Sequence, residues 1–265
     1  MEYILNNEEI KNVVEKNEIY YSVVELNDVL YLNNRLYKQI DNLQNLSNLK
    51  TLYLNNNGWL KNKVKTDKFH ECSLESINGL DSCVNLIALY LNCNKIYKIE
   101  NLDYLSNLRI LNLENNNISV IENLDKLTLL EELNLNNNCL GSKGSAQVYN
   151  LQNNDKLTIL NLSNNQINED IINDLSRLKH LSILYFVNNP ILTTYGNYRR
   201  LFVHMLKALT FLNYRPIKKE ERRCVEAFFE GGLQKEQEEL EKIKFEKRAQ
   251  QEFEVEYFRR HIMNK

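Results

Sequence analysis

"RILNLENNNISVIENL", residues 109–124, sets three consecutive asparagines between two short runs of leucine and isoleucine. Leu111 and Leu113 are separated by one residue, and Asn116 follows three residues after Leu113. Such a stretch is either low-complexity sequence or a motif in which one asparagine has a fixed structural position. Only a motif recurs along the chain at a constant spacing, so the fold depends on whether this stretch is repeated.

The stretch is repeated several times. Two leucines separated by one residue, followed three residues later by asparagine, occur at Leu52, Leu54 and Asn57; Leu89, Leu91 and Asn94; Leu111, Leu113 and Asn116; Leu133, Leu135 and Asn138; and Leu160, Leu162 and Asn165. A degenerate copy follows at Leu184, Phe186 and Asn189, and an earlier leucine pair at Leu30 and Leu32 lacks the asparagine. The steps between leading leucines are 22, 37, 22, 22, 27 and 24 residues. A 22-residue period with insertions is typical of the leucine-rich repeat.

This repeat predicts an α/β solenoid, a curved right-handed horseshoe with a parallel sheet on its concave face. Each leucine pair would form a short strand whose leucines point into the core. The chain must then turn out of the sheet, which leaves buried backbone groups that need hydrogen-bond partners. An asparagine amide supplies both donors and an acceptor, so we predict a structural ladder of one buried asparagine per coil, formed by Asn57, Asn94, Asn116, Asn138, Asn165 and Asn189. Asn115 and Asn117 are expected at surface turn positions, where replacement should cost little.

The residues between the paired leucines should lie on the concave face, which in this architecture commonly binds a protein partner. This column contains no charged residue and consists of Tyr31, Tyr53, Tyr90, Asn112, Asn134, Asn161 and Tyr185. A row of tyrosines could form a protein-binding strip, because tyrosine combines apolar area with a hydroxyl group. The column could equally reflect composition, since the chain contains 15 tyrosines and is rich in asparagine. The sequence leaves both interpretations open.

Composition narrows the class of function. The 33 basic and 35 acidic side chains give a net charge of -2, which predicts neither a nucleic-acid partner nor a membrane surface. The first 21 residues lack the pattern of a signal peptide, and we expect a monomer in the cytoplasm or the nucleus. The 5 cysteines form no CxxC pair, the 4 histidines are scattered, and we find no cofactor or metal motif. These observations predict a protein that is not an enzyme.

Two departures from the period are interpreted as insertions. The 37-residue step exceeds the period by 15 residues and places an insertion at about residues 59–75, with a lysine cluster that favours a solvated loop over a phosphate site. Its lysines are Lys61, Lys63, Lys65 and Lys68. The "GSKGS" at residues 141–145 lacks the spacing of a phosphate-binding loop. Neither segment therefore indicates nucleotide chemistry.

The segment after the repeats resembles the dynein axonemal assembly factors of the leucine-rich-repeat class. The motifs that carry the resemblance are Asn188-Asn189-Pro190, Asn197-Tyr198-Arg199-Arg200, "LTFLNYRP" at residues 209–216, Glu221-Arg222, Glu226-Ala227 and Gly231-Gly232. "LNDVLYL" at residues 26–32 is similar to the start of that family's first repeat. The resemblance covers roughly residues 19–250, and Asn213 stands where the family has aspartate.

The chain is expected to divide into four parts. They are an N-terminal helical cap at residues 1–25, leucine-rich repeats at 26–192, a C-terminal repeat cap at 193–217 and a charged helical tail at 218–265. The cap should cover the last coil of an otherwise open solenoid, with Tyr198, Arg199, Arg200, Arg215 and Pro216 as its characteristic residues. In the tail, Leu233, Leu240 and Ile243 form a partial apolar stripe, so a coiled coil and a helix that docks on a partner are equally open.

The resemblance implies a non-catalytic scaffold for the cytoplasmic preassembly or targeting of axonemal dynein arms in cilia or flagella. Its implied partners are axonemal dynein chains and assembly co-chaperones, with tubulin as a further candidate. The repeats alone also suit a regulatory subunit of a protein phosphatase, or a tubulin-binding protein. The cap and the tail, rather than the repeats, favour the dynein interpretation.

Overall fold

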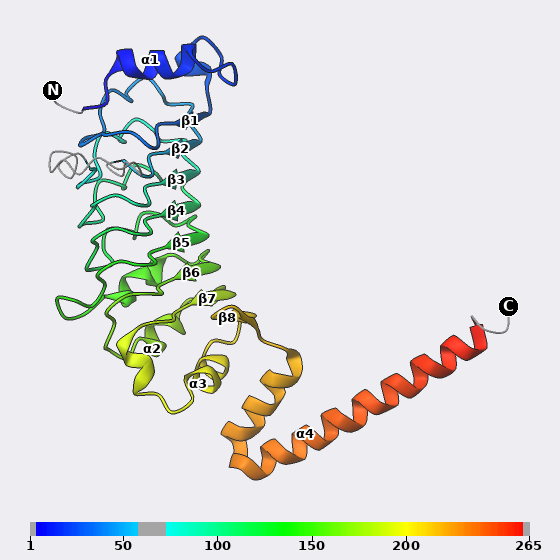
Figure 1. The fold of residues 1–265 in the computed structure, drawn as a ribbon. Helices are drawn as coiled ribbons and strands as arrows, with labels where there is room; N and C mark the ends of the chain where they lie inside the picture. Colours follow the sequence, from blue (N-terminus) through cyan, green and yellow to red (C-terminus); the bar gives the residue numbers. More distant parts are fainter. Residues whose placement is uncertain (1–3, 58–72, 262–265) are drawn as a thin grey trace, which may run out of the picture.

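The computed structural model describes residues 4–57 and 73–261. Within this part of the chain, nine short strands form one sheet in sequence order (Figure 1). The strands are β1 (Val29–Tyr31), β2 (Thr51–Tyr53), β3 (Ala88–Tyr90), β4 (Ile110–Asn112), β5 (Glu132–Asn134), β6 (Ile159–Asn161), β7 (Ile183–Tyr185), β8 (Phe211–Leu212) and β9 (Arg215–Pro216). Neighbours from β1 to β8 are parallel, and β9 is antiparallel to β8. The lysine cluster of the predicted insertion lies outside the described residues.

The register of the sheet explains the leucine spacing. The leading leucine of each coil pairs with the leading leucine of the next, as Leu111 does with Leu89 and Leu133. These side chains are at most 1% exposed from Leu30 to Leu212. Because successive side chains on a strand point to opposite sides, one face of the sheet lines the core and the other faces solvent. The solvent-side surface of β1–β8 is called the concave face below.

The core is completed on the side opposite the sheet. After each strand the chain turns away and returns through a second row of buried aliphatic residues, such as Ile118, Ile121 and Leu124. Most of this return path consists of turns, with short helices in the longer coils. The helices are η3 (Val148–Asn153), α2 (Ile172–Leu175) and η4 (Pro190–Thr193).

A helix covers the first coil. The helix α1 (Asn7–Glu15) begins after Asn6, whose side chain accepts a hydrogen bond from the Glu9 N–H, and it buries Ile10, Val13 and Val14. The short helix η1 (Val24–Leu26) then leads into β1. The Tyr20 hydroxyl accepts a hydrogen bond from the backbone of Tyr31, which satisfies one donor on the open edge of the sheet.

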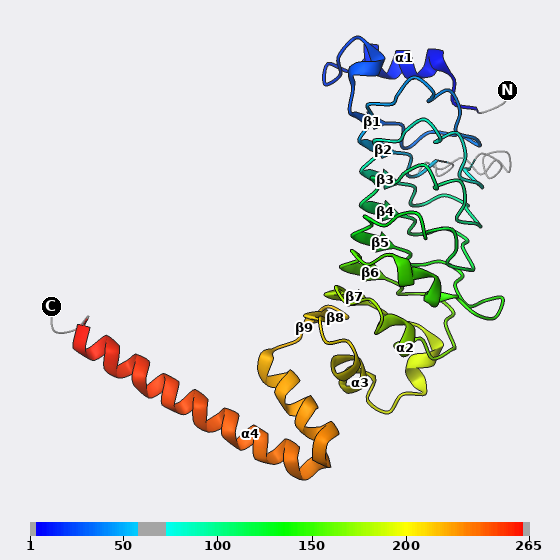
Figure 2. The same ribbon diagram turned by 180° about the vertical axis from the view of Figure 1, so that it is seen from behind.

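The last coil is covered by α3 (Tyr198–Met205), the β8–β9 hairpin and the start of α4 (Lys219–His261). The helix α4 consists of two helical halves, because Gly231 and Gly232 have non-helical backbone angles. Gly232 has a φ of 71°, a conformation that glycine adopts without steric cost. The chain reverses there, and the second half extends away from the solenoid (Figure 2). Within the described residues, no helix combines the length and apolarity needed to span a bilayer.

The contacts of the cap continue past residue 217, where the sequence predicted that the tail begins. The Arg222 guanidinium donates to the backbone carbonyls of Val203 and Leu209, and Cys224 and Val225 are buried. The second half of α4 then packs against the first, burying Ile243. Ion pairs join the two halves of α4. Arg223 pairs with Glu239 and Glu246, and Lys247 pairs with Glu220.

Candidate protein-binding surface

The three tyrosines at the N-terminal end of the concave face form a continuous ring stack. The centroids of Tyr31 and Tyr53 lie 4.6 Å apart, and those of Tyr53 and Tyr90 lie 4.5 Å apart with an interplanar angle of 2°. The stack forms because the three residues are in register on parallel strands, whose spacing matches that of stacked rings. Tyr31 is 42% exposed, and the other two are half-buried.

The Tyr90 hydroxyl at the end of this tyrosine stack is neutral at physiological pH. Burial raises the pKa of Tyr90, and the neighbouring Tyr53 and Glu132 raise it further. Tyr90 therefore offers a partner an apolar ring and an uncharged hydroxyl group.

The middle of the same column has a local structural role that the sequence did not predict. The side-chain oxygens of Asn112, Asn134 and Asn161 each accept a hydrogen bond from the backbone N–H two residues further on, at 3.0, 3.0 and 3.1 Å. Such Asx turns direct the chain out of the strand. These three asparagines are thus engaged with their own backbone, and the surface available to a partner is concentrated at the tyrosines.

Two carboxylates lie beside these asparagines. Glu114 accepts hydrogen bonds from the side-chain amides of Asn134, at 3.2 Å, and Asn136, at 2.8 Å. Glu132 is half-buried on β5. The neighbouring Glu131 is paired with Arg109 at 2.7 Å.

The C-terminal end of the column is aromatic again. The ring of Tyr185 lies 5.9 Å from that of Phe211 and 5.1 Å from that of Tyr214, between centroids. Tyr214 is 65% exposed. The concave face therefore has an aromatic group at each end and an amide-rich centre.

The predicted ladder asparagines lie inside the coil rather than on this surface. The Asn116 amide donates to the carbonyls of Leu91 and Leu113, and its oxygen accepts from the Ile96 N–H at 3.0 Å. These contacts join one coil to the preceding one. Asn57, Asn94, Asn138, Asn165 and Asn189 are also buried and donate to backbone carbonyls in the same way.

A second row of asparagines precedes this ladder by one residue. Asn115 has a φ of 55° and Asn137 a φ of 53°, and the Asn137 amide donates to the Asn115 side-chain oxygen at 2.6 Å. Positive φ recurs at this position in Asn34, Asn56, Cys93, Asn164 and Asn188. Asparagine tolerates this conformation better than most residues. Asparagine stands one residue before five of the six ladder asparagines, with Cys93 before Asn94, and this recurrence was the signal available in the sequence.

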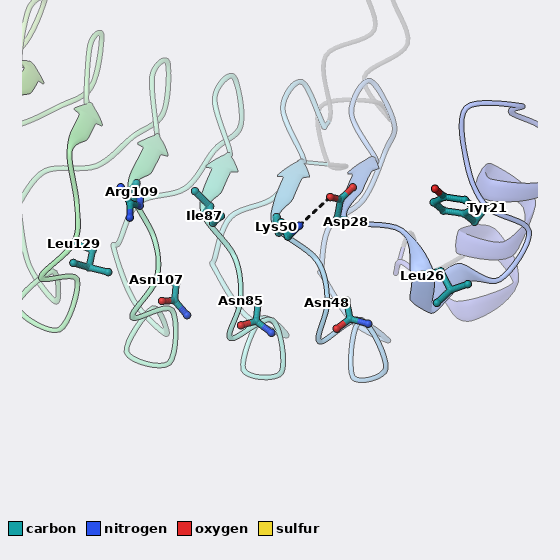
Figure 3. Close-up of a pocket in the computed structure, with 10 residues that line it drawn as sticks. All are labelled: Tyr21, Leu26, Asp28, Asn48, Lys50, Asn85, Ile87, Asn107, Arg109 and Leu129. Atoms are coloured by element: carbon teal, nitrogen blue, oxygen red, sulfur yellow. Dashed lines mark hydrogen bonds and ion pairs between the residues drawn. The ribbon is translucent and has the colours of Figure 1, made fainter.

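A groove runs beside the amino-terminal ends of the first strands (Figure 3). It encloses about 670 Å³. Asn48, Asn85 and Asn107 occupy equivalent positions in successive coils, and each donates to a carbonyl of the preceding coil. Asp28 and Lys50 lie side by side along one side of the groove and form an ion pair of 3.3 Å. The groove is lined by Tyr21, Leu26, Asp28, Asn48, Lys50, Asn85, Ile87, Asn107, Arg109 and Leu129.

The predicted cap residues mainly hold α3 to its neighbours. Arg199 donates to the carbonyls of Leu212 and Pro216 and to both oxygens of Glu221. Arg200 pairs with Glu236 at 2.8 Å, and its guanidinium carbon lies 3.9 Å from the centre of the Phe228 ring. The Tyr198 ring meets Phe202 edge-on. Arg215 and Pro216 form the exposed strand β9.

Among the described residues, no group of three His, Cys, Asp or Glu side chains is placed to hold a metal ion. Burial raises the pKa of the Cys83 thiol to about 11 and also raises the pKa of Cys224. Both thiols are therefore protonated at neutral pH, which disfavours a nucleophilic role.

Comparison with known proteins identifies relatives. A profile of the leucine-rich repeat family matches residues 88–244. Human dynein axonemal assembly factor 1 is 36% identical over 93 residues, which cover 35% of this chain and 13% of the human protein. The leucine-rich repeat-containing protein ODA7 of Chlamydomonas reinhardtii is 35% identical over 79 residues, 29% of this chain and 18% of the algal protein.

The matched region is thus a small part of each of these relatives. Among solved structures, an internalin from Listeria monocytogenes matches with a TM-score of 0.49 and 21% identity, over 79% of this chain and 58% of the internalin chain.

Proposed function

The chain belongs to the leucine-rich repeat family, and on that premise we propose that it is a non-catalytic scaffold that binds a protein partner on its concave face. The observation that carries the proposal is the stack of Tyr31, Tyr53 and Tyr90. Rings that are already ordered lose little conformational entropy on binding, and tyrosine is enriched at the energetic centres of protein interfaces.

The partner that we propose belongs to the machinery that assembles axonemal dynein arms. Two observations support this: the relatives named dynein axonemal assembly factor 1, and the cap and tail motifs that resemble that family. The partners would be axonemal dynein chains and assembly co-chaperones, with tubulin as a further candidate. The protein would act during preassembly in the cytoplasm or during targeting to the cilium or flagellum.

Affinity purification tests this proposal. The tagged full-length chain, expressed in cells that are building flagella, should recover axonemal dynein chains. A variant carrying Tyr53→Ala and Tyr90→Ala should recover much less. Tyr104→Ala provides a matched control, because Tyr104 is 62% exposed but lies outside the strands. Recovery of a phosphatase catalytic subunit in place of dynein would contradict the proposal and favour a phosphatase regulator.

A deletion strain tests the cellular role. Loss of the chain should leave axonemal microtubules in place but without dynein arms, and motility should fail. Electron microscopy of axonemes, with rescue by the full-length chain, measures this directly. Normal arms in the deletion strain would rule out the dynein role.

A further inference from the structure

We infer that the concave face binds a basic segment of its partner, with cationic side chains seated at Glu132 and Glu114. This inference rests on the proposed function, since it specifies the chemistry of the partner that the same face would bind.

The first observation is that Glu132 has no counter-charge. It is half-buried on β5, and within residues 4–57 and 73–261 its carboxylate forms neither an ion pair nor a hydrogen bond. The neighbouring cation, Arg109, is already paired with Glu131 at 2.7 Å. An incoming cation could therefore pair with this carboxylate without first breaking an existing ion pair.

The second observation is that Glu114 is held in place by neutral groups alone. The amides of Asn134 and Asn136 each donate to one of its oxygens. These contacts orient the carboxylate but leave its charge uncompensated. An oriented carboxylate binds a guanidinium or an ammonium group with little further ordering.

The third observation concerns the surroundings of these carboxylates. The concave positions of β3–β6, together with the residue two positions after each strand, contain no lysine or arginine. The tyrosine stack ends at Tyr90, because the next residue in register is Asn112. One face of the Tyr90 ring is therefore left without an aromatic neighbour among the described residues, and a cation can stack on such a face.

The geometry favours a segment with two cations over a single basic residue. Glu132 precedes Asn134 by two residues on β5, whereas Glu114 lies two residues after β4 and accepts a hydrogen bond from the Asn134 side chain. Asn134 thus separates the two carboxylates. A segment crossing the strands would place one cation beside Tyr90 and Glu132 and a second beside Glu114.

The test is a selection from a phage-displayed library of random peptides on the immobilised full-length chain. The selected peptides should carry at least two lysine or arginine residues. The best of them, made synthetically, should bind the Glu114→Gln, Glu132→Gln double variant about tenfold more weakly or worse. Glu122→Gln is the matched control, because Glu122 is also half-buried but lies outside the sheet, and it should bind like the wild type. Thermal melts check that both variants remain folded.

The outcomes separate the inference from the proposed function. Selected peptides that are neutral or acidic, or a basic peptide that binds the double variant as tightly as the wild type, overturn the inference. If the peptides that overturn the inference still bind the Tyr53→Ala variant more weakly than the wild type, the concave face remains a protein-binding surface. If no selected peptide distinguishes the wild type from Tyr53→Ala, the inference and the proposed binding face both fail.

Discussion

Arg199 and Glu221 form a two-contact ion pair, with Nε to Oε1 at 2.6 Å and Nη2 to Oε2 at 2.9 Å, that joins α3 to the first turn of α4. The pair makes the start of α4 part of the cap. The helix was expected from the sequence to be a separate tail, but its first half completes the cover of the last coil.

Truncation should reveal this role. A chain ending at residue 217 loses the Arg199 ion pair, the contacts of Arg222 with backbone carbonyls, and the buried side chains Cys224 and Val225. We expect it to melt at least several degrees below the full-length chain. A chain ending at residue 248 keeps these contacts and should melt like the full-length chain. Circular dichroism melts compare the three, and equal melting of the shortest chain would place the end of the cap at Pro216.

The two asparagine rows should respond differently to substitution. Asn116→Ala leaves the buried Ile96 N–H without its acceptor and removes one of the two amide donors of the Leu91 and Leu113 carbonyls. It should lower the free energy of unfolding by about 1 to 3 kcal/mol. Asn115→Ala should cost about 1 kcal/mol, because alanine is strained at a φ of 55°. Asn115→Gly should recover most of that cost, because glycine adopts this φ freely. Urea denaturation measures all three variants. A harmless Asn115→Ala would show that the backbone there relaxes.

The tyrosine stack should matter more for binding than for folding. Tyr53→Ala removes two ring contacts and should lower the free energy of unfolding by about 0.5 to 1.5 kcal/mol, while partner capture falls severalfold or more. Tyr53→Phe keeps the stack and should melt like the wild type. Melting curves and pull-down yields are compared for both variants. A Tyr53→Ala variant that melts early and still binds would make the stack purely structural.

The cap should also be sensitive to acid. A hydrogen bond from Arg199 is the main cause that holds the pKa of Glu221 below 4.5, the usual value of a glutamate. The unfolded chain therefore takes up this proton at a higher pH than the folded chain, so the stabilisation is present above pH 4.5 and is lost as the pH falls below it. The difference in unfolding free energy between the wild type and Glu221→Gln should shrink between pH 6 and pH 3. A constant difference would show that the ion pair contributes nothing that depends on ionisation.

The fold was predictable because the same leucine spacing is repeated in coil after coil. Leu111 and Leu133 could be placed in register from sequence alone, and the structure confirms the parallel sheet. The second asparagine row was less accessible. Asn115 was expected at a surface turn, but its link to Asn137 depends on the close stacking of coils.

Two other features could not be told from the sequence, the first because asparagine is common throughout the chain and the second because it depends on a tertiary contact. The Asx turns at Asn112, Asn134 and Asn161 show that part of the uncharged column serves the backbone, whereas composition could not separate them from the tyrosines. The pairing of Arg223 with Glu246 requires the reversal at Gly231 and Gly232. From sequence, Glu246 belongs to a solvated helix.

The register of the sheet also bears on how this chain can change over evolution. Leu52 pairs with Leu89 across 37 residues of sequence in the same way that Leu89 pairs with Leu111 across 22. The pairing of neighbouring strands thus does not depend on the length of the segment that connects them. Lineages can lengthen or shorten one coil without remodelling its neighbours, so sequence length should diverge there faster than at the leucine and asparagine positions.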